Sequence, residues 1–242
     1  MNKLQSYQKT YTITTNYLDR FDDLTPMGIL DLFQDIAGRH AYFLGAGYDA
    51  MVARGLFWVI ARNEVKIIKQ PTFGADLKIT TWPLAPSRFY FDRIYEVRDE
   101  SNEVCLIGRS RWLIVDTHER KMKPSTAYRF PLDAYKQENH FSEDFPRLSQ
   151  VSISEVVALK HEVRASDIDH NQHYNNARYA ELIYNALDIK DKNTIESFLI
   201  YYISECRLGD LIELYVESEG KVFNISGYHG QTLVFNSRII KR

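Results

Sequence analysis

The chain has 242 residues, of which 45% are hydrophobic and 26% charged, and its 30 Lys and Arg nearly balance 32 Asp and Glu. The 16 Tyr and 13 Phe supply much surface to bury, which excludes a disordered chain, and the small net charge of −2 provides no global field to recruit nucleic acid. The longest apolar runs, Leu56 to Ala61 and Phe198 to Ile203, are six residues, whereas a membrane-spanning helix needs about 20. The only two cysteines, Cys105 and Cys206, exclude a disulfide framework.

The first half of the chain is predicted to form a strand, one helix and then several long strands. The first strand is expected over Tyr7 to Asn16. Thr25-Pro26 predicts a helix start, because threonine caps free amide groups and proline lacks only a donor that would be unused there. The apolar stripe of this helix steps by three or four residues, through Leu30, Phe33, Ala37, Ala41 and Leu44. Gly45 and Gly47 end it, and strands follow over Leu56 to Lys69, Asp76 to Trp82, Phe89 to Arg98 and Val104 to Val115.

The second half repeats this plan. A strand is expected over Val156 to Arg164, followed by a polar stretch and a helix capped by Asn175 or Asn176. The apolar side of this helix carries Tyr179, Ala180, Ile183 and Leu187. The closing strands are predicted over Ser197 to Cys206, Leu211 to Ser218, Lys221 to Tyr228 and Thr232 to Ile240.

The repeated plan indicates an internal duplication. The stretch Gly74-Ala75-Asp76-Leu77 parallels Leu208-Gly209-Asp210-Leu211, at the start of corresponding strands. One long helix packed against several antiparallel strands is an α+β arrangement, and two such units can pair their sheets edge to edge. We therefore predict domains at 1–135 and 150–242, joined by a polar linker at 136–149.

The densest polar cluster runs from Ser166 to Asn176, directly before the second helix. A calcium loop fits its first acidic positions but fails at Gln172, where such loops need glycine, and at Arg178, where they need glutamate. A zinc site built on His170 and His173 lacks a convincing third ligand. Helix capping explains one or two of these side chains. The side chains of Asp169, Asn171 and His173 alternate along the loop. They would place an acceptor, an amide and an acid–base group around one small volume.

The run Asp169-His170-Asn171-Gln172-His173-Tyr174-Asn175-Asn176 closely resembles a segment of the acyl-acyl carrier protein thioesterases of the FatA and FatB type. The likeness continues at Glu205-Cys206 and, in the first half, at Thr81-Trp82-Pro83 and Arg111-Trp112, so that it covers essentially the whole chain. Because the chain begins at the domain, without an added targeting segment, a bacterial-like member is expected. The resemblance implies a double hot-dog fold, in which a sheet wraps each helix, and one active site built mainly by the second half.

Carried over by position, the resemblance implies a catalytic network of Asp169, Asn171, His173 and Glu205. Cys206 matches a cysteine once favoured as nucleophile in the family, while Asn175 and Asn176 are expected to support the site. Both faces of the predicted strand Phe198 to Cys206 are apolar, so its alternation does not decide whether Glu205 or Cys206 faces the site. The residues alone favour a solvated strand end for Glu205, near the turn at Gly209. On either apolar face the carboxylate would instead be partly desolvated, with a raised pKa suited to activating water. Unpaired cysteines are usually buried hydrophobes, which favours hydrolysis by activated water.

The first half lacks such a network. Its matching segment, Arg20 to Pro26, contains no Asn or His, so we expect this half to line the acyl channel instead. The candidate wall residues are Phe33, Phe57 and Trp58. An acidic carrier protein calls for a basic docking surface, for which the candidates are Arg62, Lys66, Lys69, Arg109, Arg111, Arg120, Lys121 and Lys123.

The function predicted from the sequence is hydrolysis of acyl-acyl carrier protein to free fatty acid, ending chain elongation in fatty acid biosynthesis. The expected partner is acyl carrier protein with a phosphopantetheine-linked acyl chain; no cofactor, metal, nucleic acid or membrane span is expected, and the location is cytoplasmic. Two alternatives stay open: an acyl-coenzyme A thioesterase and a non-catalytic acyl-binding hot-dog module. Chain-length preference, the choice between monomer and homodimer, and the choice of Glu205 or His173 as general base are also open.

Overall fold

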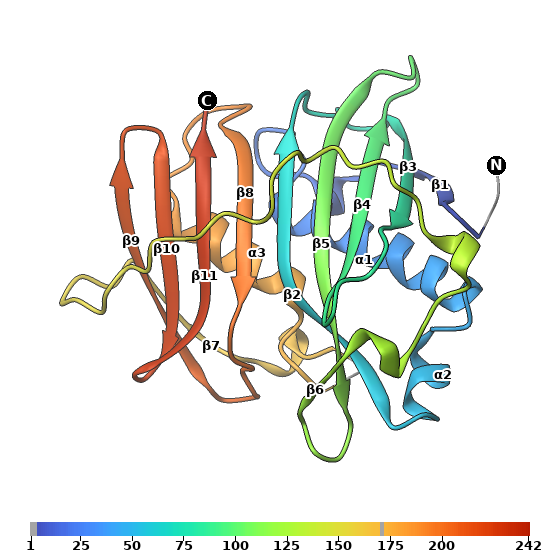
Figure 1. Cartoon of the computed structure of the whole chain (residues 1–242). Coiled ribbons are helices and arrows are strands. Elements are labelled where there is room, and N and C mark those ends of the chain that lie inside the picture. The colour runs from blue at the N-terminus through green and yellow to red at the C-terminus, as the bar shows by residue number, and fades with distance from the viewer. Residues whose placement is uncertain (1–3, 170–171) are drawn as a thin grey trace. The chain divides into compact units, whose positions relative to one another are not determined.

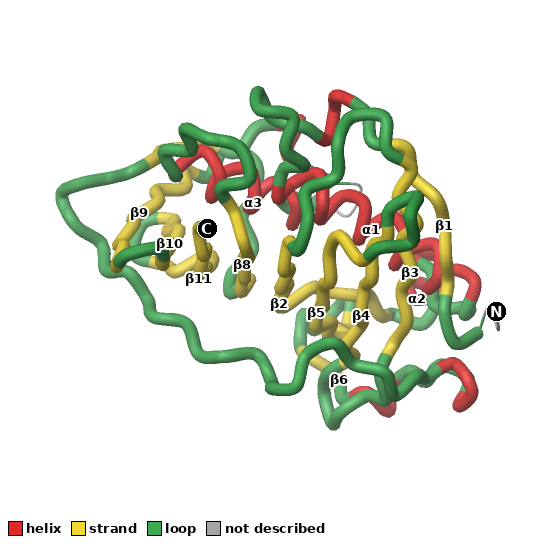
Figure 2. The backbone as a smooth tube through the Cα atoms, turned by 90° about the horizontal axis from the view of Figure 1, so that it is seen from above, coloured by secondary structure: helices red, strands yellow, loops and turns green. Residues whose placement is uncertain are grey.

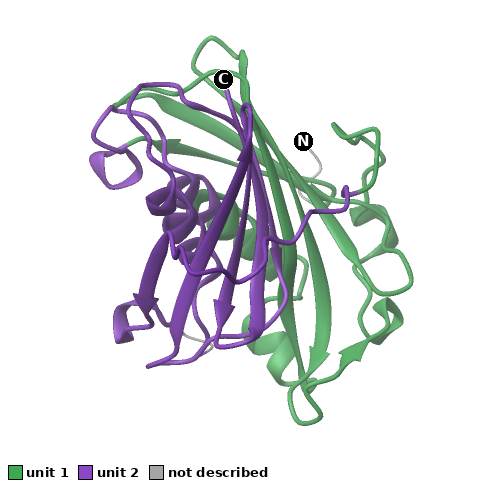
Figure 3. Cartoon of the chain, turned by 90° about the vertical axis from the view of Figure 1, so that its left-hand side faces the viewer, with its two compact units in different colours: residues 1–13, 32–144 green, residues 14–31, 145–242 purple. Residues whose placement is uncertain are grey.

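The computed structural model describes residues 4–169 and 172–242. The chain divides into two compact units, one formed by Met1–Ile13 with Leu32–Asp144 and the other by Thr14–Asp31 with Phe145–Arg242 (Figure 3). The division falls inside helix α1 (Pro26–Phe43), so the second unit includes the segment that precedes this helix. The limits 1–135, 136–149 and 150–242 stay a prediction. No helix among the described residues is long and apolar enough to span a membrane.

The first unit is an antiparallel sheet of strand order β1-β3-β4-β5-β2, with a short strand β6 paired to β5 (Figure 1). Its strands are β1 (Tyr7–Thr12), β2 (Leu56–Ile67), β3 (Asp76–Pro83), β4 (Phe91–Arg98), β5 (Val104–Asp116) and β6 (Met122–Lys123). The predicted strands are present with shifted ends. The short helix α2 (Tyr48–Val52) and strand β6 were not predicted from the sequence.

Helix α1 begins and ends as its sequence predicts. The Thr25 hydroxyl accepts a hydrogen bond from the Gly28 amide at 3.0 Å, and Gly45 follows the helix with a positive φ of 75°, which glycine adopts without steric cost. On the buried side the Phe33 ring stacks on Tyr95 of β4 at 4.2 Å. Gly108 of β5 makes room for this ring, because a Cβ there would lie 2.3 Å from it. Helix and sheet thus share one tightly packed core.

The second unit repeats the arrangement, with antiparallel strand order β8-β11-β10-β9 beside helix α3 (Asn176–Ala186) (Figure 2) and with β7 paired antiparallel to β9. Its strands are β7 (Leu159–Glu162), β8 (Ile195–Tyr202), β9 (Leu211–Glu219), β10 (Val222–His229) and β11 (Thr232–Lys241). The Tyr179 ring of α3 packs edge-on against Tyr202 of β8 and Phe235 of β11. Each unit therefore has a helix against an antiparallel sheet, and the predicted α+β hot-dog class is confirmed.

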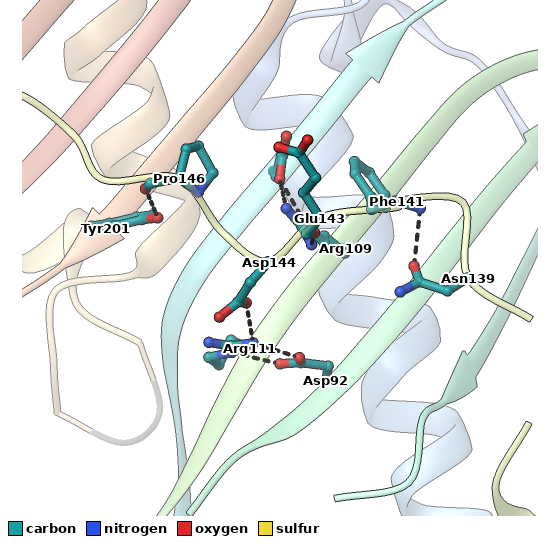
Figure 4. Close-up of polar contacts among 10 residues, drawn as sticks. Asp92, Arg109, Arg111, Asn139, Phe141, Glu143, Asp144, Pro146 and Tyr201 are labelled. Carbon is teal, nitrogen blue, oxygen red and sulfur yellow. Dashed lines mark hydrogen bonds and ion pairs between the residues drawn. The ribbon is translucent and has the colours of Figure 1, made fainter. Parts of the chain in front are cut away.

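The segment predicted as a linker is anchored along its length (Figure 4). Arg109 donates to the Glu143 carbonyl at 2.7 Å, and Arg111 is ion-paired to Asp144 at 2.7 Å. Further along, the Tyr201 hydroxyl donates to the Pro146 carbonyl, beside the buried Phe145. These contacts hold Glu143 and Asp144 on β5 of the first unit and Pro146 on β8 of the second unit.

Candidate active site

The polar cluster forms a closed loop between β7 and α3. A 3₁₀ turn at Ala165–Asp167 leads into it, and an isolated bridge pairs Ile168 with Tyr174. The Asp169 amide donates to the His173 carbonyl at 2.8 Å, and the His173 amide donates back to the Asp169 carboxylate at 3.2 Å. His173 is therefore held at the base of a small hydrogen-bonded ring. Of the predicted network, Asn171 lies outside the described residues, as does the neighbouring His170.

The loop brings His173 to Glu205, with 3.7 Å between Nε2 of the imidazole and Oε2 of the carboxylate. This separation is slightly longer than a hydrogen bond, and catalytic contacts are commonly loose before substrate is bound. The side chains are 26% and 42% exposed respectively, so water reaches both. The pair is therefore an acid–base couple accessible to solvent, which fits the activation of a water molecule.

The predicted environment of Glu205 is corrected by the structure. The strand expected to reach Cys206 ends at Tyr202, because the amides of Ile203 and Ser204 both turn to the Val234 carbonyl. Glu205 consequently lies in the loop after β8 with 42% of its side chain exposed, and not on an apolar strand face. Partial desolvation of Glu205 on a strand face is therefore wrong, and the alternative, a solvated strand end, is the one that the structure supports.

Cys206 is one residue further on and is buried, with 1% exposure. Burial raises the pKa of its thiol to about 11, and the hydrogen bond with Tyr179 lowers it only in part. The thiolate form that a nucleophile requires is therefore strongly disfavoured. The Cys206 backbone has a separate function, since its carbonyl accepts the Tyr174 amide at 3.4 Å and so ties the segment that carries Glu205 to the loop that carries His173.

The start of α3 supplies fewer free amide groups than its sequence suggests. Asn175 is the helix cap, and its side chain accepts from the Ala177 amide at 2.9 Å, while its own amide donates to the Asp167 carbonyl at 2.9 Å. Within the described residues this leaves the amide of Asn176, the first residue of α3, without an acceptor. An oxyanion near the loop would therefore meet the Asn176 amide.

Two residues next to the loop were missed from the sequence. Asp167, 7% exposed, accepts from His161 of β7 at 2.8 Å and from the Arg164 amide at 2.9 Å. Burial acts to raise the pKa of this carboxyl, but the hydrogen bonds from Arg164 and His161 outweigh it and hold the pKa below its ordinary value. Asp167 thus stays charged in a nearly buried position. The sequence placed it in the polar cluster, but nothing in the sequence pairs it with His161.

The three candidate acyl-channel residues lie in the first unit, and two of them are packed in protein. Phe33 fills the space between α1 and the sheet. Trp58 lies among other aromatic rings, 5.0 Å from Phe91 and 6.0 Å from Phe130, and its ring nitrogen donates to the Ala46 carbonyl. Phe57 is partly exposed beneath the Arg120 guanidinium. Their role in a channel stays a prediction.

The predicted basic docking residues are largely committed to internal partners. Four of the eight are ion-paired to carboxylates within the first unit, namely Lys69, Arg109, Arg111 and Lys123. Lys66 lies over the Phe141 ring and Arg120 over the Phe57 ring. Neutralised cations attract an acidic partner weakly, so this surface gives little support to a basic dock.

One group of side chains in the first unit has metal-ligand chemistry. Ligand atoms of Glu96, Glu138 and His140 lie within 4.8 Å of one another. Each carboxylate already has a cation, since Glu96 is paired with Arg98 and Glu138 with Lys136. These cations account for both carboxylates, and Nε2 of His140 lies 3.1 Å from Oε2 of Glu96, which joins the 136–149 segment to β4.

Comparison with known proteins covers nearly the whole chain. Residues 4–127 match the family domain described as "Acyl-ACP thioesterase N-terminal domain", and residues 151–239 match the corresponding C-terminal domain. The chain is 24% identical to the chloroplastic oleoyl-acyl carrier protein thioesterase 1 of Arabidopsis thaliana, over 92% of this chain and 66% of that protein. It therefore spans about two thirds of the length of this relative.

Solved structures show the same fold. An acyl-ACP thioesterase from Bacteroides thetaiotaomicron superimposes with a TM-score of 0.89 at 21% identity, covering 100% of both chains. The 12:0-ACP thioesterase from Umbellularia californica superimposes with a TM-score of 0.84 at 20% identity, covering 98% of this chain and 97% of that chain. At these identities the superpositions establish the double hot-dog fold.

Proposed function

Because the chain belongs to the acyl-ACP thioesterase family, we propose that it hydrolyses the thioester of acyl-acyl carrier protein and releases a free fatty acid. The observation that carries the proposal is the distance of 3.7 Å between Glu205 and His173. His173 lies in the loop whose sequence resembles the family's catalytic segment. An acyl-binding module without catalysis needs no solvent-accessible acid–base pair.

The proposed reaction adds water across the thioester. Glu205 and Asn171 position a water molecule, whose oxygen attacks the carbonyl carbon while the Glu205 carboxylate takes up its proton. The carbon–sulfur bond then breaks and the departing thiolate is protonated. His173 donates to the carbonyl oxygen or to the leaving sulfur, and Asp169 holds His173 in place through its amide. The Asn176 amide is available to the developing oxyanion. Exposure of Glu205 and burial of Cys206 both favour attack by water over attack by a thiolate.

The choice between a monomer and a homodimer is a separate question, which light scattering answers. The proposal includes a cytoplasmic location, in keeping with two cysteines that are both unpaired.

The test is release of free thiol from acyl-acyl carrier protein and from acyl-coenzyme A over several chain lengths. We expect turnover of the carrier-protein substrate and a loss of at least about 100-fold in kcat for His173→Ala and for Glu205→Ala. Glu219→Gln, at an exposed strand end in the same unit, is the control and should leave kcat unchanged. Faster turnover of the coenzyme A thioester would reassign the substrate, and the absence of hydrolysis on either carrier would favour a binding module.

A further inference from the structure

The second unit contains two copies of the loop that precedes a helix, and only one of them carries the candidate site. In the first copy the Asp19 amide donates to the Asp23 carbonyl at 2.9 Å, as the Asp169 amide does to the His173 carbonyl at 2.8 Å. A bridge between Leu18 and Leu24 corresponds to the bridge between Ile168 and Tyr174. The two loops therefore have the same hydrogen-bonded frame, although few of their residues agree.

The carboxylate at the head of the loop belongs to this shared frame. The Asp23 amide donates to the Asp19 carboxylate at 3.0 Å, and the His173 amide donates to the Asp169 carboxylate at 3.2 Å. Because the first loop has neither Asn nor His and still keeps this contact, the bond serves to close the loop. The feature that distinguishes the site-bearing copy must therefore be something other than this carboxylate contact.

The two ends of each loop, here called its neck, are also joined in the same way, although the residues at these positions carry different side chains. The Thr25 amide donates to the Tyr17 carbonyl at 2.9 Å, and the Asn175 amide donates to the Asp167 carbonyl at 2.9 Å. Tyr17 shows that this turn forms without a carboxylate. Burying the charged Asp167 carries a desolvation cost, so its presence only in the copy with the site calls for a role beyond folding the turn.

The Asp167 carboxylate links three parts of the site-bearing copy. The carboxylate accepts from the His161 imidazole on β7 at 2.8 Å and from the Arg164 amide at the strand end, and the backbone carbonyl of Asp167 accepts from the amide of the cap residue Asn175. The His161 ring also packs edge-on against Tyr174, at 6.0 Å between centroids. Tyr174 is the residue between His173 and Asn175, so the link reaches the backbone that carries the catalytic imidazole.

We propose that Asp167 and His161 are a positioning pair that fixes the loop backbone and thereby the approach of His173 to Glu205. The pair touches neither substrate nor water in the reaction. This inference rests on the proposed function, because positioning matters only if His173 and Glu205 act together. Displacement of a reacting group by about 1 Å can cost about 100-fold in rate, so a small loosening of the neck is enough to slow the reaction.

The test compares Asp167→Asn with Asp19→Asn, which removes the carboxylate that closes the corresponding loop of the same unit. We expect Asp167→Asn to lower kcat about 10- to 100-fold with KM changed less than about 3-fold, while Asp19→Asn keeps kcat at a similar melting temperature. His161→Ala should behave like Asp167→Asn, whereas His161→Gln, whose amide can still donate to the carboxylate, should recover most of kcat.

Residue-specific amide exchange by NMR provides a second measurement that does not depend on activity. In Asp167→Asn the amides of His173 and Asn175 should exchange at least about 10-fold faster than in the unmodified chain. Full turnover by Asp167→Asn, or equal loss of kcat in both variants in step with their melting temperatures, would overturn the positioning role. If the unmodified chain hydrolyses no thioester, the proposed function fails, and unchanged exchange at these two amides would then refute the positioning pair separately.

Discussion

The buried thiol of Cys206 allows a quantitative test of how the thioester is attacked. With a pKa of about 11 in place of the ordinary 9.0, about one molecule in a thousand carries the thiolate at pH 8, against about one in ten for an ordinary thiol. Ionisation alone therefore lowers the reactivity of Cys206 about 100-fold, and its 1% exposure lowers access further. A group with these properties is a poor nucleophile at neutral pH.

Two measurements follow from this value. Cys206→Ala should keep kcat within about 3-fold and lose about 1 kcal/mol of stability, since the Tyr179 hydroxyl loses its partner. Alkylation by iodoacetamide is measured in Cys105→Ala, where Cys206 is the sole thiol, by intact mass at pH 8. The folded protein should react at least about 100-fold more slowly than the same protein in urea.

Attack by water is refuted if a folded Cys206→Ala protein loses 100-fold or more in kcat, or if the native thiol reacts as fast as the unfolded one and the reaction abolishes turnover. Cys105→Ala is the matched control, because Cys105 is equally buried but lies in the first unit. It should leave kcat unchanged.

Gly108→Ala should lower the free energy of unfolding in urea by about 1–3 kcal/mol, since its Cβ would lie 2.3 Å from the Phe33 ring. Gly38→Ala in α1, with no atom within 4 Å of its Cβ, should instead raise it by up to about 1 kcal/mol. Equal effects of the two substitutions would contradict this packing. Arg111→Ala should cost about 3 kcal/mol because its side chain is 9% exposed, but Asp144→Ala less than about 1, because Asp144 is 71% exposed. Similar midpoints for these two would show that burial does not set the strength of the anchor.

Much of the local structure follows from neighbouring residues. Thr25 and Pro26 start α1 where the pattern predicts, and of the two asparagines offered as caps the structure selects Asn175. These features depend on contacts within a few residues, which a sequence displays directly. The predicted strand that includes Glu205 is wrong because its end depends on a contact with a residue distant in the sequence. Both faces of Phe198 to Cys206 are apolar, and the point where β8 ends is decided by the Val234 carbonyl on another strand.

The sequence by itself determined the duplicated plan, the position of the polar loop and the likeness of that loop to a thioesterase segment. Only the tertiary structure decided that His173 faces Glu205, that Cys206 is buried, and that Asp167 is paired with His161. Capping and hydrophobic periodicity are short-range properties recorded along the chain. The separation of two side chains and the burial of a thiol are set by which strands and loops pack together, and that information is distributed over the whole fold.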